Sequence, residues 1–580
     1  MIHIKNPQQL TLFDFWNFLS PKRRKMLDKS WAGLFQKEIL CELPVNKLTA
    51  FFNKEFGRPT KELYSMLGVV LLQQAHDLTD EETVNQLAFN IQWHYALNIT
   101  DESDSAKYIS LKTLWNIRQT VADKELDEVL FDKIAKKLAA IFNVNTDKQR
   151  LDSVHIKSNM ARLGRLRIFT TAIKKFLVNL KRREKGHFES IDDNIIEKYL
   201  SEKAAQCFSM VKPSESAKTI QSVGKDLFEL TQQFTGCKEV ISMNSYKLLE
   251  RILKEHCNIS GSAGNETVEL KKSKEIPSDS LQNPSDPDAT YSGHKGQGYQ
   301  VQVMETYTDT EDKDLKAKTL NLITHVRVEQ ACQSDAQALI PAIESAEERK
   351  LCPKELEADS LYGSDENCET AKSKGVELVS PTMGTAKEKN ISLADFELLK
   401  NGHVGQCPKG QAPSVHKKKK TKYIQSFCLE TCAECPLLEN CPVKRGKKFY
   451  YLRYDSKAAR LAKRRAIEQT DEFKERYRWR AGVEATMSEY DRRTGVKHLR
   501  FRGLKMVRFA AILKAIGINL FRANAVRVAI IRSRGLHNGD YSALNHVIFI
   551  VKELFRGYAK RLKQKTVTLY GFGENTPIAA

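Results

Sequence analysis

Hydrophobic residues recur at helical spacing near the start of the chain. Leu63, Met66 and Leu67 fall three or four positions apart and predict an amphipathic helix. A capping-box sequence, Thr-Asp-Glu-Glu at 79–82, predicts the start of a second helix, and Ser110 is expected to begin a third. Three short helices with tight connections are compatible with a helix-turn-helix module and equally with an ordinary small helical bundle.

Further along the chain, hydrophobic and polar residues alternate with period two, which is typical of β-strands. The predicted strands are 149–157, 298–304, 322–328, 355–359 and 376–380. Helices are predicted between the later strands, at 335–347 and at 364–375, where a serine can cap the start and a glycine marks the end.

Two segments interrupt this series. Residues 173–259 carry charged, amphipathic patterns of low hydrophobic density, which are typical of an insertion or clamp more than of the protein's core. The stretch 266–288 is polar and rich in Ser, Lys and Pro, which predicts a loop. Without the insertions, a three-stranded meander is followed by alternating helices and strands. That order predicts an α/β fold with a mixed sheet, the order of a ribonuclease H-like core.

At 580 residues the chain is several times the usual domain size, and its patterns predict several units. The core is expected to be the part that holds the mixed sheet, with the other units attached to it. The expected units are a helical N-terminal DNA-binding domain (1–140), the ribonuclease H-like core (147–380 and 449–520) with a helical insertion at about 160–290, a cysteine-rich, zinc-binding insertion (381–448) and a basic C-terminal region (521–580).

Basic residues exceed acidic ones in this chain. The 93 Lys and Arg residues oppose 72 Asp and Glu, which gives a formal net charge of +21 and indicates a polyanionic partner. The sequence shows no apolar run long enough to cross a bilayer and no signal-peptide pattern at its start, so we expect no membrane association. Nucleic acid is therefore the expected partner, and the expected location is cytoplasmic, at the nucleoid.

Three acidic residues lie where a ribonuclease H-like core carries metal ligands: on the first strand, just after the fourth strand and on the last helix. They are Asp152, Asp359 and Glu484. Mg²⁺ prefers oxygen ligands, and two such ions about 4 Å apart can activate the attacking oxygen and stabilise the leaving oxygen at phosphorus. Position alone does not separate these acids from others such as Asp147 and Glu489.

The third acid belongs to a basic segment, 460–508. If the stretch is helical, Tyr477, Arg480 and Glu484 fall on one face, with the guanidinium one turn from the carboxylate. Such a face suits a carboxylate that holds a metal beside a phosphate. An ordinary solvated helix with an ion pair has the same pattern.

The residues around the three acids resemble the motifs of DDE (Asp-Asp-Glu) transposases of bacterial insertion sequences. Asp-Ser-Val-His-Ile-Lys at 152–157 is similar to the first-acid motif, and Ala-Asp-Ser-Leu-Tyr-Gly-Ser-Asp-Glu-Asn at 358–367 to the second. Tyr477, Arg480 and Glu484 match a signature in which Tyr, Arg, Glu and a basic residue share a helix. The other similar segments are 57–59, 78–80 and 494–503.

The resemblance implies a transposase that binds the ends of its element, cuts there and joins the ends to target DNA. Asp152, Asp359 and Glu484 would hold two Mg²⁺ ions. Arg480 would orient Glu484 or a phosphate, and Tyr477 would pack or contact the DNA backbone. Two ends must be held together, so a homodimer or larger assembly is expected. The residues expected to contact DNA are His155, Lys157, Arg492, Arg493, Lys497, Arg500 and Arg502.

One position departs from the family signature, which expects Lys seven residues after Glu484. This chain has Asp491 there, followed by Arg492 and Arg493. The departure leaves open a catalytically inactive, transposase-derived DNA-binding protein. The sequence is also compatible with a general ribonuclease H-like nuclease, and with a protein that binds DNA only through its cysteine-rich insertion.

Five of the twelve cysteines lie within one short stretch. Tetrahedral Zn²⁺ takes four soft ligands, and two thiols separated by two residues can bind one ion from a tight turn. We expect a structural zinc site made by Cys407, Cys432, Cys435 and Cys441, with Cys428 as the substitute. A set of free surface thiols would have the same spacing.

Overall fold

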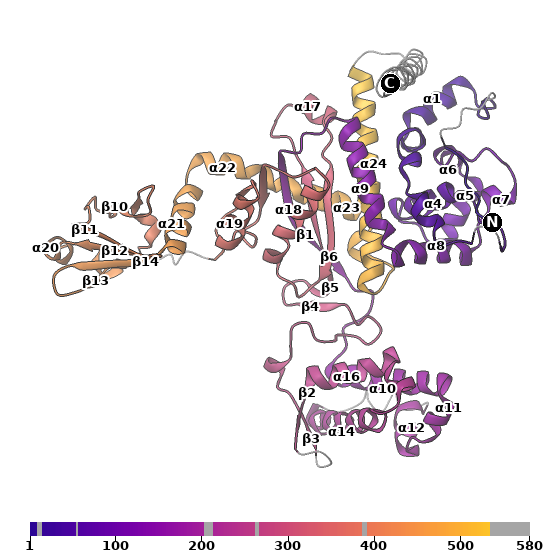
Figure 1. Ribbon diagram of the computed structural model, residues 1–580, viewed down its shortest axis with the longest axis horizontal. Coiled ribbons are helices and arrows are strands. Elements are labelled where there is room, and N and C mark those ends of the chain that lie inside the picture. Colours follow the sequence, from indigo (N-terminus) through magenta and orange to yellow (C-terminus); the bar gives the residue numbers. More distant parts are fainter. Residues whose placement is uncertain (8–13, 54–55, 202–212, 262–265, 385–390, 534–580) are drawn as a thin grey trace, which may run out of the picture.

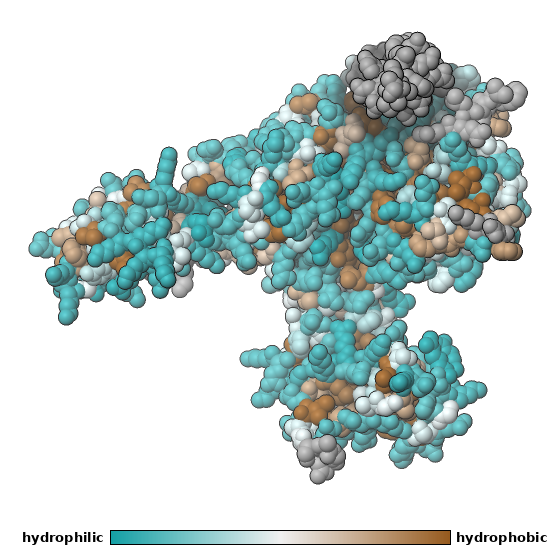
Figure 2. All heavy atoms as spheres, in the orientation of Figure 1, coloured by the Kyte–Doolittle hydropathy of each residue, from teal (hydrophilic) through white to brown (hydrophobic). Residues whose placement is uncertain are grey.

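The computed structural model of the protein describes residues 1–7, 14–53, 56–201, 213–261, 266–384 and 391–533. A mixed sheet and its helices form the centre, and the N-terminal helices, a helical lobe and a small β-rich lobe extend from it (Figure 1). The visible face is mainly hydrophilic (Figure 2). No helix in the described segments is long and apolar enough to span a membrane. Most of the expected C-terminal region, 534–580, lies outside the described residues.

The central sheet follows the order β6-β5-β1-β7-β8, and β4 shares the outer edge of β5 with β6. β5 is antiparallel to β1, whereas β7 is parallel to β1 and β8 to β7. A meander followed by parallel strands is the ribonuclease H-like topology, so the predicted fold is confirmed. The strands are β1 (Lys148–Lys157), β4 (Thr290–Ser292), β5 (Gly296–Thr306), β6 (Ile323–Gln330), β7 (Glu355–Ala358) and β8 (Glu377–Val379).

Helices cover both faces of this sheet. One face packs against α18 (Leu339–Glu348) and α19 (Asp365–Ser373), and the other against α23 (Gly482–Thr494) and α24 (Leu504–Ser533). Three further helices belong to this part of the chain: α17 (Lys313–Lys318), α21 (Ser456–Glu468) and α22 (Asp471–Tyr477). Alternation along β1 sends Leu151 into the core that holds α18, and Val154 and Ile156 into the core that holds α23 and α24. Asp152 shares the parity of Val154, so it leaves the sheet on the side of the helix that carries Glu484.

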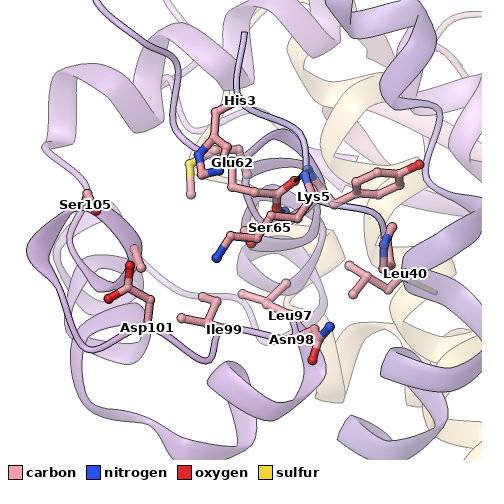
Figure 3. A pocket seen from close by; sticks show the side chains of 14 residues that line it. His3, Lys5, Leu40, Glu62, Ser65, Leu97, Asn98, Ile99, Asp101 and Ser105 are labelled. Atoms are coloured by element: carbon pink, nitrogen blue, oxygen red, sulfur yellow. Dashed lines mark hydrogen bonds between the residues drawn. The ribbon is translucent and has the colours of Figure 1, made fainter. Parts of the chain in front are cut away.

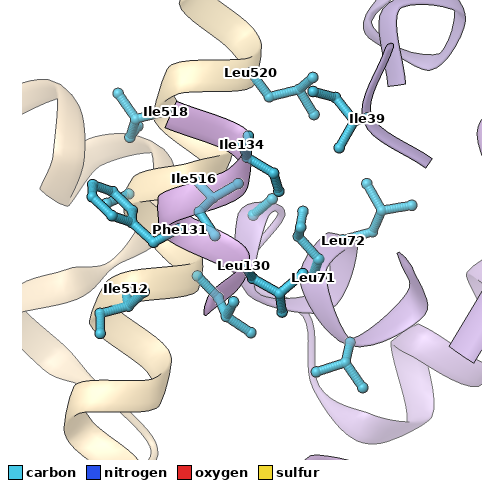
Figure 4. Packing of buried hydrophobic residues seen from close by; sticks show 14 of the residues in the cluster. Ile39, Leu71, Leu72, Leu130, Phe131, Ile134, Ile512, Ile516, Ile518 and Leu520 are labelled. Atoms are coloured by element: carbon cyan, nitrogen blue, oxygen red, sulfur yellow. The ribbon is translucent and has the colours of Figure 1, made fainter. Parts of the chain in front are cut away.

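Helix α24 joins the N-terminal helices to the sheet. Its Ile512, Ile516 and Leu520 lie in one hydrophobic core with Leu71 and Phe131 (Figure 4). The helix is buried on several sides, because α4 and α9 pack on it as well as β6. The N-terminal helices are α1 (Pro21–Lys29), α2 (Trp31–Leu34), α3 (Val45–Thr49), α4 (Leu63–Ala75), α5 (Asp80–Phe89), α6 (Ile91–Ala96), α7 (Asp104–Lys107), α8 (Leu111–Asp123) and α9 (Leu126–Ile141).

The predicted starts of two N-terminal helices are confirmed. The Thr79 side chain accepts from the amide of Glu82, and the Glu82 carboxylate accepts from the Thr79 amide, which is a capping box at the start of α5. The Ser110 hydroxyl accepts from the amide of Thr113 and caps α8. Both caps satisfy amides that have no partner inside the helix.

The helical lobe between β1 and β4 has a hydrophobic core of its own, separate from the cores beside the central sheet. Phe169, Phe176 and Leu249 are buried there, because the apolar faces of α10, α14 and α16 pack together. The predicted loop at 266–288 is wrong in part: β3 pairs with β2 as a hairpin, and Val268 is buried. The elements are α10 (Arg165–Arg183), α11 (Lys185–Glu189), α12 (Asp193–Leu200), α14 (Pro213–Gln233), α15 (Lys238–Ile241), α16 (Asn244–His256), β2 (Cys257–Ser260) and β3 (Thr267–Leu270).

The β-rich lobe lies between β8 and α21. A four-stranded antiparallel sheet, β11-β12-β14-β13, packs with the short pair β10-β9 around Phe396, Phe427 and Tyr450. Its elements are β9 (Glu397–Leu398), β10 (Val404–Gln406), β11 (Val415–Lys419), β12 (Lys422–Phe427), α20 (Leu429–Ala433), β13 (Lys444–Arg445) and β14 (Tyr450–Asp455). Helices α21 and α22 then return the chain to the central sheet (Figure 1).

Candidate active site

Strand register places two of the three candidate acids side by side. Leu151 of β1 is the partner of Ala358 in the parallel pair of β1 and β7. The next residues, Asp152 and Asp359, therefore follow at the same level of adjacent strands. Adjacent strands lie about 4.8 Å apart, so the two carboxylates occupy one small region.

The third acid, Glu484, lies in the first turn of α23, and its side chain is 73% exposed. The pattern predicted one continuous helix through Tyr477 and Glu484, but the structure breaks this stretch into two helices. Helix α22 ends at Tyr477, and a 3-10 turn spans Arg478–Ala481 before α23 begins. Arg150 of β1 donates from Nη1 to the carbonyl oxygen of Trp479 at 2.8 Å, and this contact holds the turn against the sheet.

The guanidinium of Arg480 lies among the three carboxylates. Its Nη2 is 2.7 Å from Asp152 Oδ2 and 4.0 Å from Asp359 Oδ2, and its Nη1 is 3.5 Å from Glu484 Oε1. The Arg480 side chain is 19% exposed. Three acids from three separate elements thus converge on one positive charge.

Burial shapes the electrostatics of this group. It raises the pKa of Asp152, and the carboxylates of Asp359 and Asp335 act in the same direction, whereas the Arg480 guanidinium and the Ser153 amide lower it. Burial also raises the pKa of Tyr477, whose ring stacks on another aromatic ring of α22 with centroids 5.5 Å apart. Clustered, desolvated carboxylates of this kind are stabilised by a cation.

Further polar groups border Asp152. Lys295, in the turn between β4 and β5, donates to Ser153 Oγ at 3.0 Å and lies 3.7 Å from Asp335 Oδ2. Asp335 also accepts from Gln302 Nε2 at 2.8 Å. Sequence reasoning missed Asp335, because it belongs to none of the motifs and lies in a 3-10 turn before α18.

A buried charge network fixes α23 to the sheet behind the acids. Glu305 of β5 pairs with Arg150 at 2.7 Å and with Arg522 of α24 at 2.8 Å. Thr486 of α23 donates to the same carboxylate at 2.7 Å. Sequence reasoning missed this network, because the two arginines lie 155 and 217 positions from Glu305 and only the fold brings them together.

The candidate DNA-contacting residues of β1 differ in accessibility. Lys157 is exposed at the end of the strand. His155 is partly buried, and burial lowers the pKa of its imidazole. Neither ring nitrogen of His155 has a hydrogen-bond partner within the described part of the chain. Lys157 is therefore the more accessible of the two to a phosphate.

Basic residues at the end of α23 are partly engaged within the protein. Arg492 is exposed, whereas Arg493 pairs with Glu489 at 2.9 Å. Asp491 accepts from the amide of Lys497 at 3.1 Å, and its carboxylate lies 3.8 Å from the Lys497 ammonium. In this structure, Asp491 therefore stabilises the end of its own helix.

Arg500 and Arg502 connect the segment after α23 to other parts of the fold. Arg500 Nη1 donates to Asp77 Oδ1 at 3.0 Å, and Arg502 Nη1 lies 3.4 Å from the sulfur of Met160. Both arginines remain exposed, so each retains a surface open to solvent.

Four thiols line one small cavity of about 30 Å³ in the β-rich lobe: those of Cys407, Cys432, Cys435 and Cys441. Cys428 is exposed and does not line that cavity. Burial and the neighbouring thiols raise the pKa of Cys432 to about 11. As they are placed, no three or more His, Cys, Asp or Glu side chains of the described residues form a group that could hold a metal ion. This holds for the thiols and for the three acids alike.

A second small pocket, of about 50 Å³, lies among the N-terminal helices (Figure 3). Two acidic residues, Glu62 and Asp101, line it. The Glu62 carboxylate accepts from the backbone amides of Lys5, Tyr64 and Ser65, which engages it within the N-terminal fold.

Fold and site together define a ribonuclease H-like protein with three convergent carboxylates. Two segments match known families: residues 406–523 match a model described as "Transposase DDE domain", and residues 36–120 one described as "Transposase domain (DUF772)". The first includes Glu484 but neither aspartate. No curated protein matches the sequence.

The chain is similar to one solved structure, a cryo-EM structure of a piggyBac transposase synaptic complex with hairpin DNA. The match covers 90% of this chain and 84% of that chain, at 8% identity and a TM-score of 0.27. At that TM-score the two structures differ too much for the likeness to assign a role to any residue.

Proposed function

We propose that this chain is a metal-dependent DNA transposase that binds the ends of its element, cleaves the DNA there and joins the ends to target DNA. This proposal rests on one observation: the carboxylates of Asp152, Asp359 and Glu484 lie around a single position where a positive charge is stabilised. The two transposase family matches support it. The motifs around the acids further suggest a bacterial insertion sequence as its origin.

The donor set of the three acids fits Mg²⁺, because it consists of carboxylate oxygens at a place reached by solvent. Two ions held by Asp152, Asp359 and Glu484 would neutralise the scissile phosphate and activate the attacking oxygen. The protein's part is to hold the acids in place. The amide of Ser153 donates to Asp152 Oδ1, and the amide of Leu361 donates to Asp359 Oδ1, both at 2.8 Å. Positioning and charge neutralisation account for such catalysis without a protein nucleophile.

DNA binding in this proposal rests on the net charge of +21 and on exposed basic residues around the acids. Lys157 and Arg492 are exposed on two elements that also carry acids, and Arg502 follows α23. Since two element ends must be joined in one reaction, the proposed active form is a homodimer or a larger assembly on DNA.

The β-rich lobe is proposed to hold one structural zinc ion through Cys407, Cys432, Cys435 and Cys441, with Cys428 as the substitute. All four cysteines are among the residues that line one cavity, and soft donors of this number suit tetrahedral Zn²⁺. A small lobe with a few buried aromatic residues gains stability from such a metal.

Cleavage assays with the full chain test the proposal. The substrate is DNA cloned from both sides of the gene, where the proposal expects inverted repeats, with and without Mg²⁺. Asp152→Asn, Asp359→Asn and Glu484→Gln should each lower cleavage by about two orders of magnitude or more while DNA binding survives. Glu475→Gln, at an exposed position of α22, is the matched control. Mg²⁺-dependent cleavage that persists in Asp152→Asn would contradict the proposal.

Two competing functions give different results in the same assay. A general nuclease cuts DNA without element ends as well as DNA that carries them. A catalytically inactive descendant binds the ends but cuts neither substrate, and Asp491 at the expected lysine position is the observation that favours it. The cleavage pattern on the two substrates therefore separates the three functions.

A further inference from the structure

We infer that Arg480 is a positioning residue that exchanges partners: it holds the three acids together in the free protein and passes to a DNA phosphate when DNA binds. As a consequence, the three acids bind a divalent cation only when DNA is also bound. This inference rests on the proposed function and goes beyond it, because it specifies the order in which the site is filled.

The position of the guanidinium supports this inference. The Arg480 side chain reaches all three carboxylates, with one short contact at 2.7 Å to Asp152 and longer ones at 3.5 Å to Glu484 and 4.0 Å to Asp359. A divalent cation bound by the same oxygens would lie within a few ångströms of this positive charge and be repelled by it. Arg480 and a metal ion therefore compete for one place.

The contacts of Arg480 also allow it to leave. Two of its three ion pairs are long, and its Nε has no hydrogen-bond partner among the described residues. A phosphate accepts two parallel hydrogen bonds from a guanidinium, a stronger arrangement than one short pair and two long ones. A DNA phosphate at the acids thus offers Arg480 a better partner and relieves the repulsion of the cation.

The backbone around Arg480 stays in place during such an exchange. Arg150 holds the 3-10 turn through the carbonyl oxygen of Trp479, and Thr486 anchors α23 to Glu305. Neither contact involves the Arg480 side chain. The guanidinium can therefore change partners by rotation of its own side chain, without unfolding the turn.

The same turn contains a matched arginine for comparison. Arg478 pairs with Glu311 at 3.0 Å and with Glu475 at 3.2 Å, and no ion pair joins it to the three acids within the described residues. Removal of Arg478 deletes the same charge from the same turn without freeing the acids. It is therefore the control for a general electrostatic effect.

Binding of Mn²⁺ to the full-length protein, measured by electron paramagnetic resonance with and without a DNA duplex that carries an element end, tests the exchange. Without DNA, Arg480→Ala should bind Mn²⁺ at least about tenfold more tightly than the wild type, and Arg478→Ala should stay close to the wild type. DNA should raise the affinity of the wild type by about tenfold and that of Arg480→Ala far less. Arg480→Lys keeps the positive charge but cannot donate two parallel hydrogen bonds to a phosphate. This variant should therefore bind Mn²⁺ weakly both with and without DNA.

Unchanged Mn²⁺ affinity in Arg480→Ala, or an equal gain in Arg478→Ala, overturns the inference. The double variant Asp152→Asn/Arg480→Ala separates this failure from failure of the proposed function. It should lose the Mn²⁺ affinity gained by Arg480→Ala. If the double variant keeps that affinity, the cation is not bound by the acids, and the proposed metal site itself is wrong.

Discussion

Gly482, the first residue of α23, lies against the guanidinium of Arg150 on β1. A Cβ atom at position 482 would be 2.8 Å from Arg150 Cζ. Arg150 cannot readily move aside, because it also pairs with Glu305 and donates to Trp479. The helix that carries the third acid can approach the first strand this closely only because residue 482 has no side chain.

Gly482→Ala should therefore displace α23 from β1. We expect a loss of about 1–3 kcal/mol in the free energy of unfolding, because the added methyl group overfills a packed contact. DNA cleavage should fall more than DNA binding, since Glu484 moves with the helix. Urea denaturation and cleavage assays measure the two effects. Gly186→Ala, at a glycine of α11 with open space around it, is the control, and equal effects of both substitutions would contradict the prediction.

Glu305→Gln should destabilise the protein by about 3–5 kcal/mol, because Arg150 and Arg522 would lose the carboxylate that neutralises both in the interior. Glu489→Gln removes a more exposed partner of Arg522 and leaves Arg522 paired with Glu305, so it should cost less than Glu305→Gln. Denaturant unfolding of the two variants checks the difference. A Glu305→Gln protein as stable as Glu489→Gln would show that the network does not hold α23.

Acid should destabilise the fold through His325 of β6. Burial, together with Arg349 and Arg327, lowers the pKa of its imidazole to about 3 in the folded protein. The unfolded chain binds this proton near pH 6.5, so stability falls as the pH drops from about 6.5 toward 3. Between pH 7 and 5 the contribution is about 2 kcal/mol.

Urea denaturation of the wild type and of His325→Asn at both pH values measures that contribution. The variant should lose less stability than the wild type on acidification. His498→Gln, at an exposed position, should change nothing. If the wild type and His325→Asn respond equally to acid, His325 is not the residue responsible.

The cysteine cluster predicts one zinc ion per chain, measured by elemental analysis of the purified protein. Cys432→Ser should remove the zinc and lower the thermal stability of the β-rich lobe, because a metal ligand is lost. Cys428→Ser should keep the zinc, since its thiol does not line the cavity. Loss of zinc in Cys428→Ser with retention in Cys407→Ser would instead identify Cys428 as the fourth ligand.

Local patterns in the sequence predicted five of the six strands of the central sheet in their order; the short strand β4 was missed. Period-two alternation marked β5 and β6, and the caps at Thr79 and Ser110 marked the starts of two helices. Such signals depend on residues a few positions apart, so they can be seen without knowing the fold. The sequence pattern did not predict the hairpin of β2 and β3, because its strands are short and the flanking residues are polar.

The sequence by itself therefore determined the fold class, the three candidate acids and the cluster of cysteines. Only the tertiary structure decided that Asp152 and Asp359 stand at one level of adjacent strands, and that Arg480 lies between them and Glu484. The physical reason is distance along the chain: Arg480 and Asp152 are 328 positions apart. Their contact arises from sheet register and helix packing, which no local pattern encodes.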